Sequence, residues 1–383
     1  MTYNRSSGVL LPISMLHGPY GIGVLGKEAY QFVDFLKAGG FRAWQILPVE
    51  RTGGGFSPYS GISSFAGEPM LIDPRMLHEK GLISKEELYE RAQGLDIHSV
   101  NYEVVVEKQQ KLLRLAFSRI NKQQSSERPY SRYKPFWLSD YALYMVLKRR
   151  FDQKPWYEWT SPNLRVRDTQ ALKRAAEEHE SDIEFHSFVQ WIFNEQWTKL
   201  KKYCAKNGIS IVGDMPFYVS KDSAEVWANR ELFDADENGK VTAVGGAPPD
   251  YFMADGQCWG NPVYNWKLMK EDGYRWWISR IQEALKRYDV LRLDHFRGFE
   301  SYWSIPSETM DARDGVWKNG PRMSFFRELK RALGDVPIIA EDLGVIDEPV
   351  EKLLEKSGFR GMSVLQFGFL GDTRHLPHMM TEQ

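Results

Sequence analysis

Two short apolar segments of this chain each end in an acidic residue. The segment VLRLDHFRG, residues 290–298, carries Asp294, and the segment PIIAEDLG, residues 337–344, carries Glu341. A helix-like segment separates them, so the order strand, helix, strand places a carboxylate at the carboxyl end of both strands. Catalytic residues of β/α barrel enzymes lie at that end of the strands. We therefore predict a site that contains both acids.

Strand periodicity gives these acids different neighbours. Alternate residues of a strand share a face, so Arg292 and Asp294 should be adjacent. The guanidinium is expected to lower the pKa of Asp294 and keep it ionised, as a nucleophile requires, while Glu341 is free to carry a proton. Only one of Glu341 and Asp342 can face the site, and His295 should point away unless the strand has already ended. The alternative is a structural ion pair with Glu341 capping the next helix.

Composition limits what such a site binds. The 383 residues contain 50 Lys and Arg against 51 Asp and Glu, a formal net charge of −1, so we expect no nucleic acid or anionic membrane as partner. The two cysteines, Cys204 and Cys258, have no metal-ligand spacing, so neither a disulfide framework nor a zinc site is predicted, and a reducing cytoplasm fits. The sequence contains no run of about 18 apolar residues that predicts membrane insertion. No cofactor is predicted.

Aromatic residues give the positive indication. The chain has 13 Trp, 18 Tyr and 21 Phe, and several occur in polar surroundings such as DYFMADGQCWGNPVYNW, residues 250–266. Ordinary packing is the simpler explanation for any single ring. Flat rings beside Asp, Asn and Gln nevertheless suit a ligand with C–H faces and hydroxyls, which describes a sugar. Two carboxylates with such a ligand are the minimum machinery for glycosidic bond cleavage.

Alternating elements predict the α/β class. Helices are predicted at residues 27–37, 275–287 and 324–333, and the polar, helix-periodic residues 84–206 are predicted to form a helical insertion subdomain. Strands are predicted at residues 43–49, 68–72, 209–219, 290–295, 337–340 and 361–369. Helical connections between about six strands indicate parallel βαβ architecture.

Two familiar motifs are rejected. Gly21, Gly23 and Gly26 spell GxGxxG, but no strand leads into the turn, so nucleotide binding is not predicted. The run DADENGKVTAVG, residues 234–245, begins like an EF-hand loop but has Gly245 where a bidentate Glu is needed. We predict a hairpin turn there instead.

Five sequence blocks together carry a resemblance to a known family. They are LRLDHFRG, AEDLG, SPYSGISSFAG (57–67), GDMPFYVS (213–220) and PPDYFMADGQCWGNPVYNW (248–266). The chain resembles the amylomaltase or 4-α-glucanotransferase (disproportionating enzyme) family, glycoside hydrolase family 77. That resemblance implies a (β/α)8 TIM barrel over residues 1–383 with helical and loop insertions, and a substrate-binding loop insertion at residues 220–266. The implied reaction cleaves an α-1,4 glucan with retention and transfers the glucanyl unit to the 4-hydroxyl of another glucan or glucose.

The resemblance also assigns roles to residues. Asp294 would be the nucleophile, Glu341 the acid and then the base. Tyr59 and the Gly53–Gly55 loop would form a glucan-binding region. The substrate-binding residues that it implies are Ser57, Tyr59, Asp214, Asp250, Gln257, Trp259, Arg292 and His295.

One feature of the family pattern is absent from this sequence. The family's third catalytic carboxylate lies in a THDND-type block after the sixth strand, and no such block occurs before HLPHMMTEQ, residues 375–383. We therefore expect the C-terminal strands of the barrel to be missing from this chain, which would leave two open sheet edges. An α-amylase-type hydrolase and a non-catalytic glucan-binding barrel remain alternatives. The expected partner is a maltooligosaccharide or α-glucan, and the sequence does not give the oligomeric state.

Overall fold

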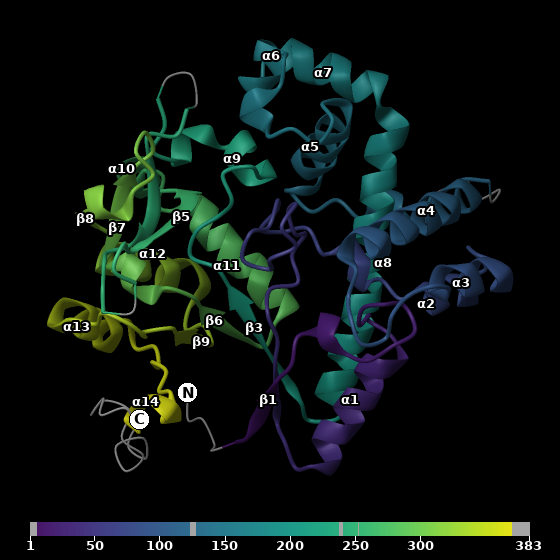
Figure 1. Ribbon diagram of the computed structural model, residues 1–383, viewed down its shortest axis with the longest axis horizontal. Coiled ribbons are helices and arrows are strands. Elements are labelled where there is room, and N and C mark those ends of the chain that lie inside the picture. The colour runs from purple at the N-terminus through teal and green to yellow at the C-terminus, as the bar shows by residue number, and fades with distance from the viewer. Residues whose placement is uncertain (1–5, 123–127, 237–239, 252, 370–383) are drawn as a thin grey trace. The chain divides into compact units, whose positions relative to one another are not determined.

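A computed structural model describes residues 6–122, 128–236, 240–251 and 253–369 (Figure 1). The chain divides into two compact units. The first unit comprises residues 1–212 and 222–230, and the second comprises residues 213–221 and 231–383. The C-terminal segment at residues 375–383, before which no third-acid block occurs in the sequence, lies outside the described residues.

The first unit contains a small parallel sheet. Strands β1 (Gly8–Leu10) and β2 (Ala43–Gln45) pair in parallel, and β2 pairs with the beginning of β3 (Ser210–Met215). Helix α1 (Lys27–Ala38) connects β1 to β2 and buries Ala29, Val33 and Leu36, at the i, i+4, i+7 spacing of an amphipathic helix. The predicted helix at residues 27–37 is therefore present, whereas β1 was not predicted.

Helices account for most of the remaining first unit. The helices predicted within residues 84–206 are present, and α3 begins with a capping box in which Ser84 and Glu87 bond each other's backbone N–H groups. Among the described residues, no helix is long and apolar enough to cross a membrane. The helices of this unit after α1 are α2 (Pro74–Glu79), α3 (Lys85–Ala92), α4 (Tyr102–Ile120), α5 (Leu138–Arg150), α6 (Pro162–Arg165), α7 (Thr169–Glu178), α8 (Glu180–Lys206) and α9 (Ala224–Ala228).

The second unit continues the parallel pattern. Strands β6 (Val290–Leu293) and β9 (Ile338–Ala340) pair in parallel, and the N–H of Asp294, just after β6, donates to the carbonyl of Met215 at the end of β3, 3.0 Å away. The carboxyl ends of these three strands therefore meet. The helices are α10 (Trp266–Glu271), α11 (Arg275–Arg287), α12 (Met323–Leu333), α13 (Glu348–Ser357) and α14 (Leu365–Gly368).

Aromatic rings form the core beside these strands. The ring of Trp277 on α11 lies 5.6 Å from that of Phe217 and 5.1 Å from that of Phe299. Phe299 in turn stacks on Phe325 of α12 at 5.0 Å. Part of the aromatic content that suggested sugar binding is thus ordinary packing, which fixes the helices behind the strand ends.

A second, antiparallel sheet in this unit was not predicted. Its strands, in the order β5-β4-β7-β8, are β5 (Gln257–Pro262), β4 (Ala243–Ala247), β7 (Ser301–Pro306) and β8 (Val316–Asn319). Val244 and Ile305 pack in its apolar core. These strands are short, and β4, β5 and β7 contain glycine or proline, so their sequence signal is weak. The predicted hairpin at residues 234–245 is supported by an antiparallel bridge between Ala235 and Val241, although residues 237–239 lie outside the described part.

Two predicted strands are wrong. Residues 68–72 contain a 3-10 turn (Pro69–Leu71), because Pro69 has no N–H for a sheet and the Glu68 carboxylate caps the N–H of Met70. Residues 361–369 contain helix α14, and strand pairing is limited to a parallel bridge between Arg360 and Ile339. The strand predicted at residues 209–219 ends at Met215.

Candidate active site

The end of β3 supplies a deeply buried carboxylate. Asp214 is only 2% exposed and lies one residue before the strand ends. Gly213 precedes it because a Cβ at that position would lie 2.2 Å from the ring of Tyr288. The sequence block that begins GDM therefore brings a strand backbone close to an aromatic ring just before the carboxyl group of Asp214.

The guanidinium of Arg292 links this carboxylate to Asp294. Its Nη1 lies 2.6 Å from Oδ1 of Asp214 and 2.8 Å from Oδ1 of Asp294. The predicted adjacency of Arg292 and Asp294, based on strand alternation, is confirmed. One cation thus serves two carboxylates, and the side chain of Asp294 remains 28% exposed while that of Asp214 is buried.

The pKa of Asp294 differs from the prediction. Burial raises the pKa of its carboxyl to about 6, and the charges of Asp214 and Glu341 act in the same direction, while Arg292 opposes them. The sequence indicated only the adjacent cation, so the predicted lowering is wrong. Asp294 nevertheless remains mostly ionised at pH 7, because that pH lies above its pKa.

Backbone amides hold the second acid. Glu341 follows β9 directly, and its own N–H donates to the carbonyl of Leu293, 2.9 Å away. Its carboxylate accepts the N–H of His295 at 2.8 Å on one oxygen and the N–H of Leu343 at 2.8 Å on the other. These bonds place the Glu341 carboxylate against the segment that follows Asp294.

The structure decides which of the two adjacent acids faces this segment. Asp342 turns elsewhere, since its Oδ1 accepts the N–H of Met362 at 2.6 Å. A Cβ on Gly361 would lie 2.5 Å from the other carboxylate oxygen, so Asp342 is packed tightly there. Glu341 is therefore the site acid of this pair.

His295 lies in an aromatic group rather than continuing the strand. The strand ends at Leu293, and His295 has a left-handed backbone with φ of 51°. Its ring lies 5.0 Å from that of Trp259, edge to face, and 6.3 Å from that of Tyr218. Burial lowers the pKa of His295 to about 4, so the ring is neutral at pH 7. Its Nε2 is buried without a hydrogen-bond partner among the described residues.

Two predicted binding residues lie on β5. The indole of Trp259 is 38% exposed, and its Nε1 donates to the side-chain oxygen of Gln257 at 3.1 Å. The Trp259 ring also contacts Tyr218, 6.0 Å away, which sequence reasoning did not single out. Asp250 lies in an exposed turn, where its Oδ1 accepts the N–H of Met253 at 2.7 Å. The block that contains these residues is thus partly strand and partly turn, not loop throughout.

Ser57 and Tyr59 belong to the first unit. They lie in the glycine-rich segment after β2, where the N–H of Tyr59 donates to Oγ of Ser57 at 3.3 Å. Tyr59 is 37% exposed. The other predicted site residues all lie in the second unit.

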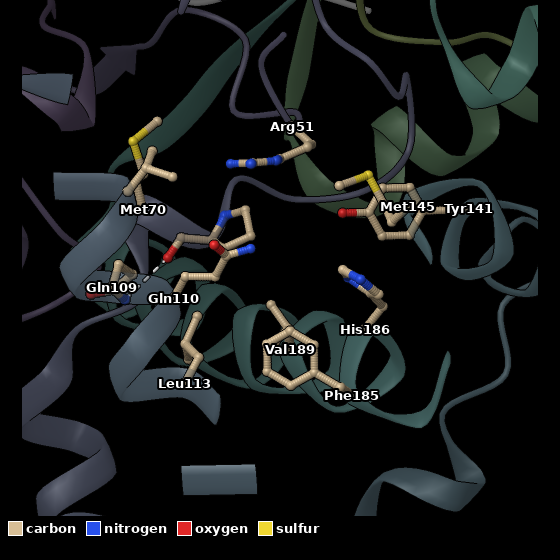
Figure 2. Close-up of a pocket in the computed structure, with 12 residues that line it drawn as sticks. Arg51, Met70, Gln109, Gln110, Leu113, Tyr141, Met145, Phe185, His186 and Val189 are labelled. Atoms are coloured by element: carbon tan, nitrogen blue, oxygen red, sulfur yellow. Dashed lines mark hydrogen bonds between the residues drawn. The ribbon is translucent and has the colours of Figure 1, made fainter. Parts of the chain in front are cut away.

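Two hollows lie within the first unit. An open one of about 770 Å³ is lined by Gly53, Gly54 and Phe56 of the glycine-rich segment together with residues of α4 and α5. Figure 2 shows a small neighbour of about 40 Å³, surrounded by side chains that include Arg51 and His186. That space holds a few water molecules at most. Of these two hollows, the open one has room for a sugar.

Comparisons with known proteins agree with this geometry. Residues 11–383 match the sequence model of the 4-alpha-glucanotransferase family. The chain is 44% identical over 380 residues to a 4-alpha-glucanotransferase of Streptococcus pneumoniae serotype 4, covering 98% of this chain and 75% of that protein. It is 45% identical over 381 residues to a 4-alpha-glucanotransferase of Aquifex aeolicus, covering 99% and 77%.

A solved structure extends the likeness to the fold. The amylomaltase from Streptococcus agalactiae in complex with acarbose is 42% identical and superimposes with a TM-score of 0.96, covering 99% of this chain and 78% of that one. This similarity confirms the predicted α/β class, a TIM-type barrel with helical and loop insertions. By sequence and by structure, the chain belongs to the 4-alpha-glucanotransferase family.

Proposed function

We propose that this protein is a 4-α-glucanotransferase that acts with retention on α-1,4 glucans. The observation that carries the proposal is the meeting of Asp294 and Glu341 at adjacent strand ends, one paired with a cation and the other held by backbone amides. A retaining mechanism needs this pair of carboxyl groups, one as nucleophile and one as proton carrier.

In the first step, Asp294 attacks the glucan. Its ionised oxygen forms a bond to C1 of the donor sugar as the bond from C1 to the departing O4 breaks. The proton of Glu341 goes to that O4, so the departing glucan leaves as an alcohol. Because the pKa of Asp294 is about 6, most molecules carry the required charge at pH 7.

In the second step, the acceptor replaces the enzyme. The 4-hydroxyl oxygen of another glucan or of glucose attacks C1, and the bond from C1 to Asp294 breaks. Glu341 takes the hydroxyl proton and returns to its starting state. Two inversions at C1 give net retention. Arg292 stabilises the Asp294 carboxylate that leaves, at its present distance of 2.8 Å.

Surrounding residues hold the sugar. Asp214 accepts hydrogen bonds from sugar hydroxyls or holds Arg292 in place. Trp259 and the neutral His295 offer ring faces and a polar edge beside Asp294. Gln257 and Asp250 are exposed, so a sugar can reach both side chains. Ser57, Tyr59 and the Gly53–Gly55 segment bind glucan as well, beside the open hollow of the first unit.

Insertions have separate roles in this scheme. Residues 84–206 form a helical insertion subdomain within the catalytic barrel of residues 1–383, and residues 220–266 form the substrate-binding insertion.

The partner is an α-glucan, with maltooligosaccharides as the expected substrates, and acarbose is expected to compete with them because a similar amylomaltase was solved with it.

Product analysis tests the proposal. Full-length protein is incubated with maltotriose, and the products are separated by chain length. A transferase yields both longer maltooligosaccharides and glucose or maltose. Shorter sugars alone would instead indicate a hydrolase, and unchanged maltotriose that still binds would indicate a non-catalytic glucan-binding barrel.

A further inference from the structure

A buried arginine links the two halves of the active site. Arg297 lies in the 3-10 turn (Phe296–Phe299) that follows the nucleophile segment and is 6% exposed. Its Nη1 donates to the carbonyl of Val345, and its Nη2 lies 3.6 Å from a carboxylate oxygen of Asp347. Both partners belong to the loop that begins with Glu341. Arg297 thus joins the turn after Asp294 to the loop of the proton carrier.

Apart from Arg297, the loop is held from outside by the bond between Asp342 and the N–H of Met362 at 2.6 Å. Helix α13 begins only at Glu348, with Asp347 as its N-cap, and Gly344 has φ of +84°. Between described residues, no backbone-to-backbone hydrogen bond holds residues 342–346. The carboxylate of Glu341 depends on two amides, one of them the N–H of Leu343 within this same loop. Movement of the loop would therefore move the acid.

Arg297 is also fixed on its other sides. Its Nη2 donates to Oγ of Ser301 at 3.1 Å, and its guanidinium lies 4.0 Å from the ring centre of Trp317 on β8. Its Nε is buried without a partner among the described residues. A buried charge with one unsatisfied N–H is unfavourable for folding, so a residue of this kind requires an explanation other than stability.

We propose that Arg297 is a positioning residue for the proton transfer of Glu341. It fastens the loop of residues 341–347 to the turn that follows Asp294, so that the Glu341 carboxylate stays where the departing O4 and the incoming hydroxyl pass. Arg297 touches neither sugar nor reacting atoms in this scheme. The inference rests on the proposed function, because it assumes that Glu341 carries the proton.

The test separates proton transfer from nucleophilic attack. With maltotriose the leaving group is a sugar oxygen, which needs a proton to depart. With α-maltosyl fluoride the leaving group is fluoride, which needs none. Two rates are measured for full-length R297K and R297M. The first is the rate of transfer from maltotriose, and the second is the rate of fluoride release in the first turnover, called the fluoride burst. Transfer is expected to fall by about 30- to 100-fold with KM changed by less than about 3-fold, while the fluoride burst stays within about 3-fold of the unmodified protein.

A matched variant controls for the loss of a buried arginine. Arg280 on α11 is 3% exposed, lies 5.1 Å from the ring centre of Trp277, and also has an Nε without a partner among the described residues. It bonds the carbonyls of Pro216 and Phe217 rather than the Glu341 loop. R280K should therefore keep the unmodified ratio of the two rates, even if both decrease.

Chemical rescue gives a second readout. Millimolar guanidinium should restore transfer in R297A, and it should not change the ratio of the two rates in R280A. The inference is overturned if the R297 variants lose both rates in proportion or lose neither. The proposed function fails in a different way. It fails if D294N still releases fluoride in the first turnover, or if the unmodified protein forms only sugars that are not longer than maltotriose.

Discussion

Two carboxylates, one in each unit, pair with an arginine but differ in how many other donors they have. Glu68 in the first unit is 4% exposed, and its oxygens accept from Nη1 of Arg51 at 2.6 Å, from both the N–H and the hydroxyl of Thr52 at 2.8 Å, and from the N–H of Met70 at 3.2 Å. Asp294 in the second unit has a side chain that is 28% exposed and has Arg292 as its partner at 2.8 Å.

This difference in donors separates a structural carboxylate, Glu68, from one that can react, Asp294. The lone pairs of Glu68 are taken up by donors, so this carboxylate is a satisfied structural group. Asp294 shares its cation with Asp214, and its Oδ2 has no protein donor among the described residues, so this oxygen is accessible to a reacting carbon. Arg51 and Glu68 form a structural ion pair of the kind that was the alternative explanation for Arg292 and Asp294.

Loss of the Asp294 charge should have the largest effect. D294N removes the nucleophile but keeps the side-chain shape, so transfer from maltotriose should fall by at least about 10³-fold. Initial rates on maltotriose measure it, with E68Q assayed per folded molecule as the control, which should stay near the unmodified rate. Substantial transfer by D294N would show that Asp294 is as structural as Glu68.

Loss of the Glu68 charge should affect stability instead. E68Q leaves Arg51 without its buried anion, which is expected to lower the free energy of unfolding by about 3 kcal/mol. Urea denaturation measures the change. The control is E177Q, whose exposed pair with Lys173 at 3.9 Å should contribute less than about 0.5 kcal/mol. Equal stability of both variants would contradict the contrast.

D294N should also stabilise the protein in a pH-dependent manner. The folded-state pKa of Asp294 is raised to about 6. The stability that its protonated carboxyl group contributes is therefore fully present below the unfolded pKa near 4 and is lost as pH rises through 6. An Asn cannot ionise, so D294N should be more stable than the unmodified protein by about 3 kcal/mol at pH 8, with no gain below about pH 4. Thermal unfolding across that range measures it. A constant difference at all pH values would contradict the raised pKa.

The smallest predicted effect is a shift in the pH profile. Transfer should decline as pH falls through about 6, because Asp294 becomes protonated. Arg292 lowers that pKa, so R292Q should move the acid limb of kcat/KM upward by about one pH unit, whereas R292K, which keeps the charge, should leave it nearly in place. An unchanged limb in R292Q would mean that Asp294 does not control it.

Local patterns predicted much of the site. Strand alternation placed Arg292 beside Asp294, and the helices at residues 27–37, 275–287 and 324–333 were predicted from periodicity. Periodicity failed where a short apolar run contained Pro69, which cannot donate in a sheet. It also missed the short strands of the antiparallel sheet, of which β4 pairs with β7 about 60 residues away.

The sequence by itself determined which residues are available for chemistry: two acids at strand ends, an arginine on the face of one of them, and aromatic rings among hydroxyl-binding groups. Only the tertiary structure decided that Glu341 rather than Asp342 faces the segment after Asp294, because distant amides select the direction of each side chain. It also decided the sign of the pKa shift of Asp294. Residues close in the sequence reveal an adjacent cation, but burial and the carboxylates of Asp214 and Glu341 act on the pKa of Asp294 only after the chain has folded.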